Sequence, residues 1–258
     1  MSEEQITQQG WVKLEEKDGI GIITFFHPKS NSLPGKVLKE LAETITKAGK
    51  DDAVKVIVLK SEGVKAFCAG ASFDELLSIE DFETGKEFFM GFARVINAAR
   101  KCPKFIIGRL QGKAVGGGVG MASAVDYCFA TEEASVKLSE LAIGIGPFVV
   151  GPAVERKLGT SAMSQLAINA TEWKSALWAK RRGLYTEIYE SVLAMDEAVH
   201  SLAVKLSKSN AEAMALLKGN FWEGTEHWDE LLEKRAELSG RLVLSEFTTN
   251  AINQFKNR

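Results

Sequence analysis

The sequence has few cysteines and few prolines, three and five respectively among 258 residues. The three cysteines, Cys68, Cys102 and Cys128, cannot all pair and show no CxxC spacing, so neither a disulfide framework nor a zinc cluster is expected. No run reaches the roughly 18 apolar residues that a membrane-spanning helix needs. The longest candidate, 143–154, is interrupted by glycines and prolines. We therefore expect no disulfide, no bound metal and no membrane partner.

An excess of charge of one sign is also lacking. Lys and Arg total 32 and Asp and Glu total 34, which gives a net charge of −2. This near-balance argues against a nucleic-acid partner held by a basic face. The segment 1–10 is polar and acidic, unlike a secretory or transit signal. The expectation is a soluble protein of a reducing compartment, the cytoplasm.

The motifs of several common enzyme classes are absent. There is no GxSxG, no HExxH and no glycine-rich loop that ends in GK[ST]. A dinucleotide-binding GxGxxG is broken at Met121. The three histidines are scattered, and we expect His27 in a turn and His200 and His227 packed or solvated on helices. These absences argue against a serine hydrolase of the GxSxG type, a zinc protease, a P-loop nucleotide-binding protein and a dinucleotide-binding enzyme. They do not indicate which reaction the protein catalyses.

Strand and helix signals alternate in the first part of the chain. Two segments, 34–49 and 81–100, place apolar residues at helical spacing. This alternation with strands predicts an α/β architecture with largely parallel sheets. The predicted buried strands are 19–26, 54–59, 104–110 and 125–130.

After about residue 150 the strand signals stop. The pattern there predicts a helical extension packed on the first part. Its expected helices are 160–170, 171–182, 195–208, 210–219, 225–238 and 243–255.

Two glycine-containing segments each follow a predicted strand. They are AFCAGASFDEL at 66–76 and GKAVGGGVGMASA at 112–124. Ser72 and Glu75 have the spacing of a capping box, which predicts a helix directly after Ala71. Both segments would offer backbone N–H groups at a helix N-terminus, where unpaired donors and the helix dipole favour negative charge. Taken singly, either segment is better explained by tight turns and close packing.

Taken together, the ordered segments resemble the crotonase superfamily, also called the enoyl-CoA hydratase/isomerases. The similarity covers nearly the whole chain, and the ordered set is more specific than any one motif. The other matching segments are VKLEEKDGIGIITFFHPKSNSL at 12–33, KLSELAIGIGP at 137–147 and SEFTTNAINQFKNR at 245–258.

The resemblance implies a fold, a substrate and an assembly. The implied fold is an α/β spiral of ββα turns with two roughly perpendicular sheets over 1–190, followed by a C-terminal helical region over 191–258 that makes trimers. A homotrimer, or a hexamer made of two trimers, is therefore expected. The implied substrate is an acyl-CoA thioester, and no separate cofactor is implied because coenzyme A is part of the substrate.

The resemblance also implies an oxyanion hole for the thioester carbonyl. By motif position its two backbone amides are those of Ala71 and Gly117, and the Ala69 carbonyl is expected to meet the adenine. The chemistry requires such donors, because removing a proton beside a thioester pushes charge onto its oxygen as an enolate. Glycine at position 117 would let the carbonyl approach the backbone.

The family carries up to two catalytic carboxylates, and this sequence has one of them. The first position is Gly120, so that carboxylate is missing, whereas the second is Glu140. Hydration in the family normally uses two carboxylates, whereas moving a double bond from position 3 to position 2 needs one, which takes a proton from C2 and returns it at C4. The segment 144–148 also resembles that of mitochondrial-type Δ3,Δ2-enoyl-CoA isomerases. Isomerisation is the preferred chemistry, with the pKa of Glu140 raised by an apolar pocket.

Other activities stay open at this point. A hydratase could recruit a second acid from the region 72–90, where the carboxylic acids are Asp74, Glu75, Glu80, Asp81 and Glu83. A decarboxylase, or a hydratase of branched or methylglutaconyl-type substrates, is a further alternative. A non-catalytic relative that binds acyl-CoA is the alternative outside enzymes.

Several other residues are assigned by position in the resemblance. Ser72 stands where the family usually has Asp, which changes the helix cap and leaves the amides in place. Asp126 is expected to be structural. The candidates for contact with the nucleotide part of CoA are Lys29, Phe255 and Arg258. The candidates for the acyl tunnel are Phe88, Phe89, Phe92 and Phe148.

Overall fold

The chain opens with a β-hairpin. In the computed structural model, which describes residues 9–256, β1 (Trp11–Lys17) and β2 (Ile20–Phe26) pair antiparallel. Asp18 and Gly19 form the turn with φ angles of 56° and 81°. A two-residue hairpin turn with positive φ at both positions favours an Asp-Gly pair. The predicted opening strand pair is confirmed.

The hairpin begins a six-stranded sheet in the order β1-β2-β4-β7-β9-β11. Every pair after the hairpin is parallel, which confirms the largely parallel sheet. The expectation of helices alone after about residue 150 is wrong at β11, because a strand of three residues is too short to show an alternating pattern. The parallel strands added to β2 are β4 (Val56–Ser61), β7 (Ile106–Leu110), β9 (Tyr127–Thr131) and β11 (Glu187–Tyr189).

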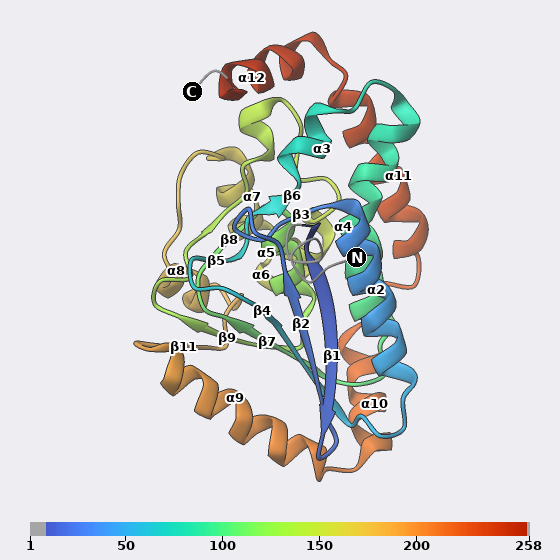
Figure 1. The fold of residues 1–258 in the computed structure, drawn as a ribbon, viewed down its shortest axis with the longest axis vertical. Coiled ribbons are helices and arrows are strands. Elements are labelled where there is room, and N and C mark those ends of the chain that lie inside the picture. Colours follow the sequence, from blue (N-terminus) through green and yellow to red (C-terminus); the bar gives the residue numbers. More distant parts are fainter. Residues whose placement is uncertain (1–8, 257–258) are drawn as a thin grey trace.

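Both faces of this sheet are covered. On one face Ile57 and Leu59 join the main core. On the other face Val56 and Val58 pack against α9 (Val192–Ser207). Burial on both faces explains why β4 is apolar at successive positions instead of alternating. Figure 1 shows α9 beside the sheet, at the opposite end of the molecule from α12.

Two smaller sheets carry the glycine-containing segments. One has the order β10-β8-β5 and the other pairs β3 with β6, and all of these pairs are parallel. Parallel pairing places the carboxyl ends of neighbouring strands at the same edge of a sheet. The strands are β3 (Ser32–Leu33), β5 (Ala66–Cys68), β6 (Gly70–Ala71), β8 (Lys113–Val115) and β10 (Val136–Lys137).

A short helix follows each of three of these strands. The helix α3 (Phe73–Leu77) follows β6, α5 (Gly117–Ala124) follows β8, and the 3₁₀ helix η1 (Glu140–Ile143) follows β10. The predicted helix start after Ala71 is confirmed. The starts of α5 and η1 therefore lie at the same edge of their sheet.

The remaining helices surround this framework. The predicted helix over 171–182 is shorter in the structure, because Lys174 pairs with Val136 in a β-bridge and Ser175 then caps α8. No helix in the described part of the chain combines the length and the apolar character needed to cross a bilayer. The bounds are α2 (Gly35–Lys50), α4 (Phe82–Lys101), α6 (Gly151–Leu158), α7 (Thr160–Ile168), α8 (Ala176–Arg181), α10 (Ala211–Phe221), α11 (Trp228–Leu242) and α12 (Glu246–Lys256).

The C-terminal helices share the core of the first part. Trp222, Trp228 and Leu232 belong to the same hydrophobic cluster as the strands of the main sheet. The helices α11 and α4 approach closely, since a Cβ on Gly240 would lie 2.6 Å from the Lys86 backbone nitrogen. Residues on both sides of the predicted boundary at 190 and 191 therefore contribute to one core, and the boundary itself stays a prediction.

A buried ion pair between Lys218 of α10 and Asp126, which directly precedes β9, connects α10 to the main sheet. The Lys218 ammonium lies 2.9 Å from Asp126 Oδ2, and the two side chains are only 2% and 6% exposed. Asp126 Oδ2 also accepts the Ile106 N–H at 2.8 Å, and Lys218 donates to the Lys104 carbonyl at 2.8 Å. Asp126 is structural, as expected.

Breaking this pair should destabilise the fold strongly. In Lys218→Met the Asp126 carboxylate stays buried without its counter-charge, and removing one partner of a buried pair costs about 3–5 kcal/mol of unfolding free energy. Urea unfolding of the variant and the wild type measures the loss. The matched control is Lys101→Met, which removes an exposed partner of Asp229 and should change little. Equal stability of Lys218→Met and wild type would contradict the role given to the pair.

Candidate active site

A cavity of about 530 Å³ lies where the three short helices begin. Ala69, Ala71, Gly117 and Glu140 all line it. These four positions come from three separate segments of the chain. The structure thus brings together the residues that the sequence assigned to the oxyanion hole, the acid/base and one CoA contact.

Gly117 is the first residue of α5, and its place leaves no room for a side chain. Its N–H has no hydrogen-bond acceptor among the described residues, as is usual for the first turn of a helix. A Cβ at this position would lie 2.2 Å from Cζ of Phe92. The Phe92 ring therefore occupies the place where a side chain on Gly117 would lie.

Ala71 ends the short strand β6. The next amide, that of Ser72, donates to the Leu33 carbonyl at 2.9 Å. Because successive amides of a strand point to opposite sides, the Ala71 N–H is directed away from β3. Ser72 Oγ caps α3 by accepting the Glu75 N–H at 3.3 Å. Glu75 does not complete a capping box, since its Oε2 accepts the Gly35 N–H at 2.8 Å instead.

Glu140 begins η1, and its carboxyl group is buried beside Gly116. A Cβ on Gly116 would lie 2.9 Å from Glu140 Oε1, and the φ angle of 53° at Gly116 favours glycine there. Glu140 Oε2 is buried without a hydrogen-bond partner among the described residues. Burial disfavours the charged form and raises the pKa of Glu140 from 4.5 to about 7.

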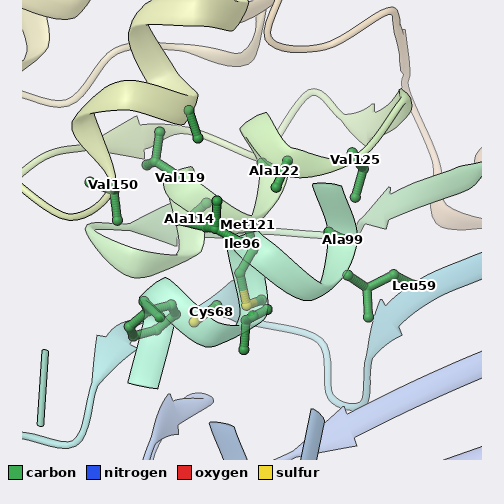
Figure 2. Close-up of a cluster of buried hydrophobic side chains, with 14 of the residues drawn as sticks. Leu59, Cys68, Ile96, Ala99, Ala114, Val119, Met121, Ala122, Val125 and Val150 are labelled. Carbon is green, nitrogen blue, oxygen red and sulfur yellow. The ribbon is translucent and has the colours of Figure 1, made fainter. Parts of the chain in front are cut away.

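Gly120, where a second carboxylate was missing from the sequence, is closely packed. A Cβ there would lie 2.6 Å from Cγ1 of Val150 and 3.5 Å from Cδ1 of Ile96. Figure 2 shows Val150 and Ile96 in the apolar cluster around α5. A carboxylic acid at position 120 would require Val150 to move. The cluster thus fills the space that a second carboxylate would need.

The five other acids considered as a second carboxylate do not line the cavity. Asp74 pairs with Lys29, Glu75 bonds to Gly35, and Asp81 caps α4 by accepting the Thr84 N–H at 2.8 Å. Glu80 and Glu83 are exposed. Glu140 is therefore the one carboxylic acid among the described residues that line the cavity.

One part of the cavity wall is apolar. Phe88, Phe89, Phe92 and Phe148, the four candidates for the acyl tunnel, all line it. Phe88 and Phe89 pack edge to face with ring centroids 5.1 Å apart. Such a wall excludes water and fits a hydrocarbon chain.

Of the three residues predicted to contact the nucleotide part of CoA, the structure describes the side chain of Lys29 only. Lys29 does not line the cavity, and its ammonium pairs with Asp74 at the surface. Phe255 lies in α12, but its side chain is outside the described residues, as is all of Arg258. These three assignments stay predictions.

Sequence reasoning missed two features of the cavity. Val150 excludes a side chain at Gly120, and Lys137 lines the wall three residues before Glu140. Neither shows in a motif, because their importance comes from the packing of segments distant in the chain. In residues 9–256 no group of three or more His, Cys, Asp or Glu side chains is placed to hold a metal ion.

The chain is similar to known proteins over nearly its whole length. It is 27% identical over 238 residues to a probable enoyl-CoA hydratase of Bacillus subtilis, covering 92% of each chain. It is 28% identical over 247 residues to a short-chain-enoyl-CoA hydratase of Clostridium acetobutylicum, covering 95% and 94%. The crystal structure of an enoyl-CoA hydratase from Bacillus halodurans superposes with a TM-score of 0.87 at 22% identity, over 95% of this chain and 99% of that one.

A match to a protein family also covers nearly the whole chain. Residues 15–254 match the family described as enoyl-CoA hydratase/isomerase. That span includes the hairpin, both glycine-containing segments, Glu140 and most of α12. With this match and the superposition on a crotonase-type structure, the chain is an enzyme of the enoyl-CoA hydratase/isomerase family and has the crotonase fold.

Proposed function

We propose that the protein is a Δ3,Δ2-enoyl-CoA isomerase that uses Glu140 as its single acid/base. The observation that carries this proposal is Glu140, the one carboxylic acid among the described residues that line the cavity, whose buried Oε2 has no hydrogen-bond partner among those residues. The packing of Val150 against Gly120 supports it, because no second acid stands there to activate a water molecule. An acyl-CoA thioester with a double bond at position 3 is the proposed substrate.

The reaction begins with removal of a proton from C2. The thioester oxygen accepts hydrogen bonds from the amides of Ala71 and Gly117, and the Glu140 carboxylate takes the C2 proton. The electron pair of the C–H bond moves onto the thioester oxygen as an enolate. One fixed amide donor stabilises such a developing charge by about 3–4 kcal/mol, because it needs no reorganisation.

The reaction ends with return of the same proton. The enolate collapses, its electrons shift the double bond from position 3 to position 2, and the Glu140 carboxyl delivers the proton to C4. The substrate and the product are isomers, so no water or other reactant is consumed. A base whose pKa is about 7 suits both halves of this cycle, because it is partly ionised near neutrality and is also able to donate.

Parallel assays with two substrates test the proposal. The purified protein is incubated with a 3-enoyl-CoA and with a 2-enoyl-CoA, and the products are separated by chromatography. The expected result is conversion of the 3-enoyl ester to the 2-enoyl ester with negligible addition of water. Robust addition of water to the 2-enoyl ester would contradict the proposal and would identify the protein as a hydratase. Binding without turnover of either ester would indicate a non-catalytic relative.

Hydration is the second candidate because both curated relatives described above are named enoyl-CoA hydratases. In this chain it would need a water molecule activated by Glu140 alone, or an acid from a segment that does not line the cavity. The apolar wall and the filled space at Gly120 count against such a water. The product ratio in the parallel assays separates the two candidates.

We propose, as a separate matter, that the chain forms a homotrimer or a hexamer. Membership of the enoyl-CoA hydratase/isomerase family supports this proposal, because the resemblance to that family implies a C-terminal helical region that makes trimers. Light scattering of the purified protein should give the mass of three or six chains.

A further inference from the structure

Two lysines lie over the ring of one tryptophan, Trp173. The ammonium of Lys137 lies 4.6 Å from the ring centroid of Trp173, and that of Lys113 lies 5.1 Å from it. Lys137 also lines the cavity that contains Glu140. A positive group is therefore held at the wall of an otherwise largely apolar site.

The pairing of strands explains why these three side chains converge. Lys137 of β10 is opposite Val115 of β8, and Lys113 lies two residues before Val115, so the two lysines lie on the same face of the small sheet. Trp173 is carried by a segment tied to β10, since the backbone groups of Val136 and Lys174 exchange hydrogen bonds of 2.8 and 2.9 Å. The backbone therefore fixes this cluster, which we call the Lys-Trp-Lys cluster.

The charge of the cluster is not neutralised within the described residues. Neither Lys113 nor Lys137 has a carboxylate within ion-pair distance there. The nearby acid Glu172 is engaged by Lys174 at 2.9 Å. A cation over an aromatic ring keeps its charge and its N–H donors, although the ring orients it. Lys137 therefore brings a positive charge that no described carboxylate neutralises to the wall of the cavity, which favours an anionic group of a ligand.

We propose that the Lys-Trp-Lys cluster, chiefly Lys137, binds an anionic oxygen group of the thioester that occupies the cavity. This inference rests on the proposed function, since it takes the ligand to be an acyl-CoA ester. Such an ester can supply the anion from two sources, a phosphate of CoA or a carboxylate at the far end of the acyl group. Lys29 is paired with Asp74 and does not line the cavity, whereas Lys137 is the one Lys or Arg among the described residues that line it.

Binding of three saturated thioesters, which do not turn over, tests the proposal. The ligands are butyryl-CoA, butyryl-pantetheine without the nucleotide phosphates, and glutaryl-CoA with a terminal carboxylate. Calorimetry gives the Kd of each for the wild type, Lys137→Met and Lys137→Arg. The matched control is Lys47→Met, which removes an exposed lysine of α2 that does not line this cavity.

The two sources of the anion predict different patterns. If the anion is a phosphate, Lys137→Met raises the Kd of butyryl-CoA and glutaryl-CoA about tenfold and leaves that of butyryl-pantetheine unchanged. If it is an acyl carboxylate, only glutaryl-CoA is affected. In either case Lys137→Arg retains most of the affinity, and Trp173→Leu weakens binding about two- to fivefold because the ammonium groups are no longer oriented.

Two results would overturn the inference, and they can be told apart. Unchanged affinity of Lys137→Met for all three ligands would mean that the cluster only packs at the surface, while the proposed function would stand. Failure of the wild type to bind either CoA ester would remove the proposed function and the inference together.

Discussion

Glu140→Gln is expected to lower kcat for 3-to-2 isomerisation by roughly 10³- to 10⁴-fold. The amide cannot take the C2 proton, and no other carboxylic acid among the described residues that line the cavity can replace it. General acid/base catalysis contributes about 10² to 10⁴ in rate, and here one group serves both half-reactions. KM should change little, because Gln has nearly the same shape. Steady-state kinetics with a 3-enoyl-CoA measures both constants.

The control for this variant is its stability. The pKa of Glu140 is raised in the folded state from 4.5 to about 7, so the folded state holds its proton more tightly than the unfolded state. The stability from this difference is fully present below pH 4.5 and is lost as the pH rises through 7, and it corresponds to about 3 kcal/mol. Glu140→Gln should therefore be more stable than the wild type at pH 8. Wild-type activity in a folded Glu140→Gln would contradict the assignment of the base.

Gly117→Ala is expected to lower kcat by roughly 10²- to 10³-fold, the loss typical of one displaced oxyanion donor. The added Cβ would lie 2.2 to 2.4 Å from three atoms of the Phe92 ring, so the ring or the start of α5 must shift. The backbone at Gly117 does not have the positive φ that would disfavour alanine, so contact with the ring is the cause of the loss. Kinetics with the same 3-enoyl-CoA measures the effect.

A second substitution separates this contact from other causes. Leucine at position 92 lacks the ring atoms nearest the new Cβ, so Gly117→Ala combined with Phe92→Leu should recover part of the lost activity. The matched control is Gly219→Ala in α10, where an added Cβ meets nothing within 4 Å and activity should not change. Full activity in Gly117→Ala alone would mean that the Gly117 amide is not part of the oxyanion hole.

The sequence predicted the architecture where local patterns are long and regular. A long amphipathic helix such as 81–100 carries a clear helical period, and a buried strand such as 54–59 shows as a continuous apolar run, so both appear in the structure within a few residues. β11 was missed because its three residues carry no period. The helix expected over 171–182 starts late because the tertiary pairing of Lys174 with Val136 overrides local helix propensity.

The sequence predicted those residues of the candidate site that belong to a recognisable motif. Ala69, Ala71, Gly117 and Glu140 each belong to a motif, and the structure places all four on one cavity. Val150 could not be found in this way, because its effect on position 120 arises from the contact of α5 with a segment thirty residues later. The contact of Lys137 with Trp173 could not be found in this way either, because a β-bridge between distant segments brings the two together.

The pH dependence of kcat/KM for 3-to-2 isomerisation tests most directly the claim that Glu140, with its pKa raised by burial, is the sole base. Because kcat/KM reports ionisations of the free enzyme, the active carboxylate form should titrate near pH 7. The predicted result is a plateau above pH 8 and a tenfold fall per pH unit below about 6.5, caused by one ionisation. A profile that is flat from pH 5 to 8, or that needs two ionisable acids, would contradict it.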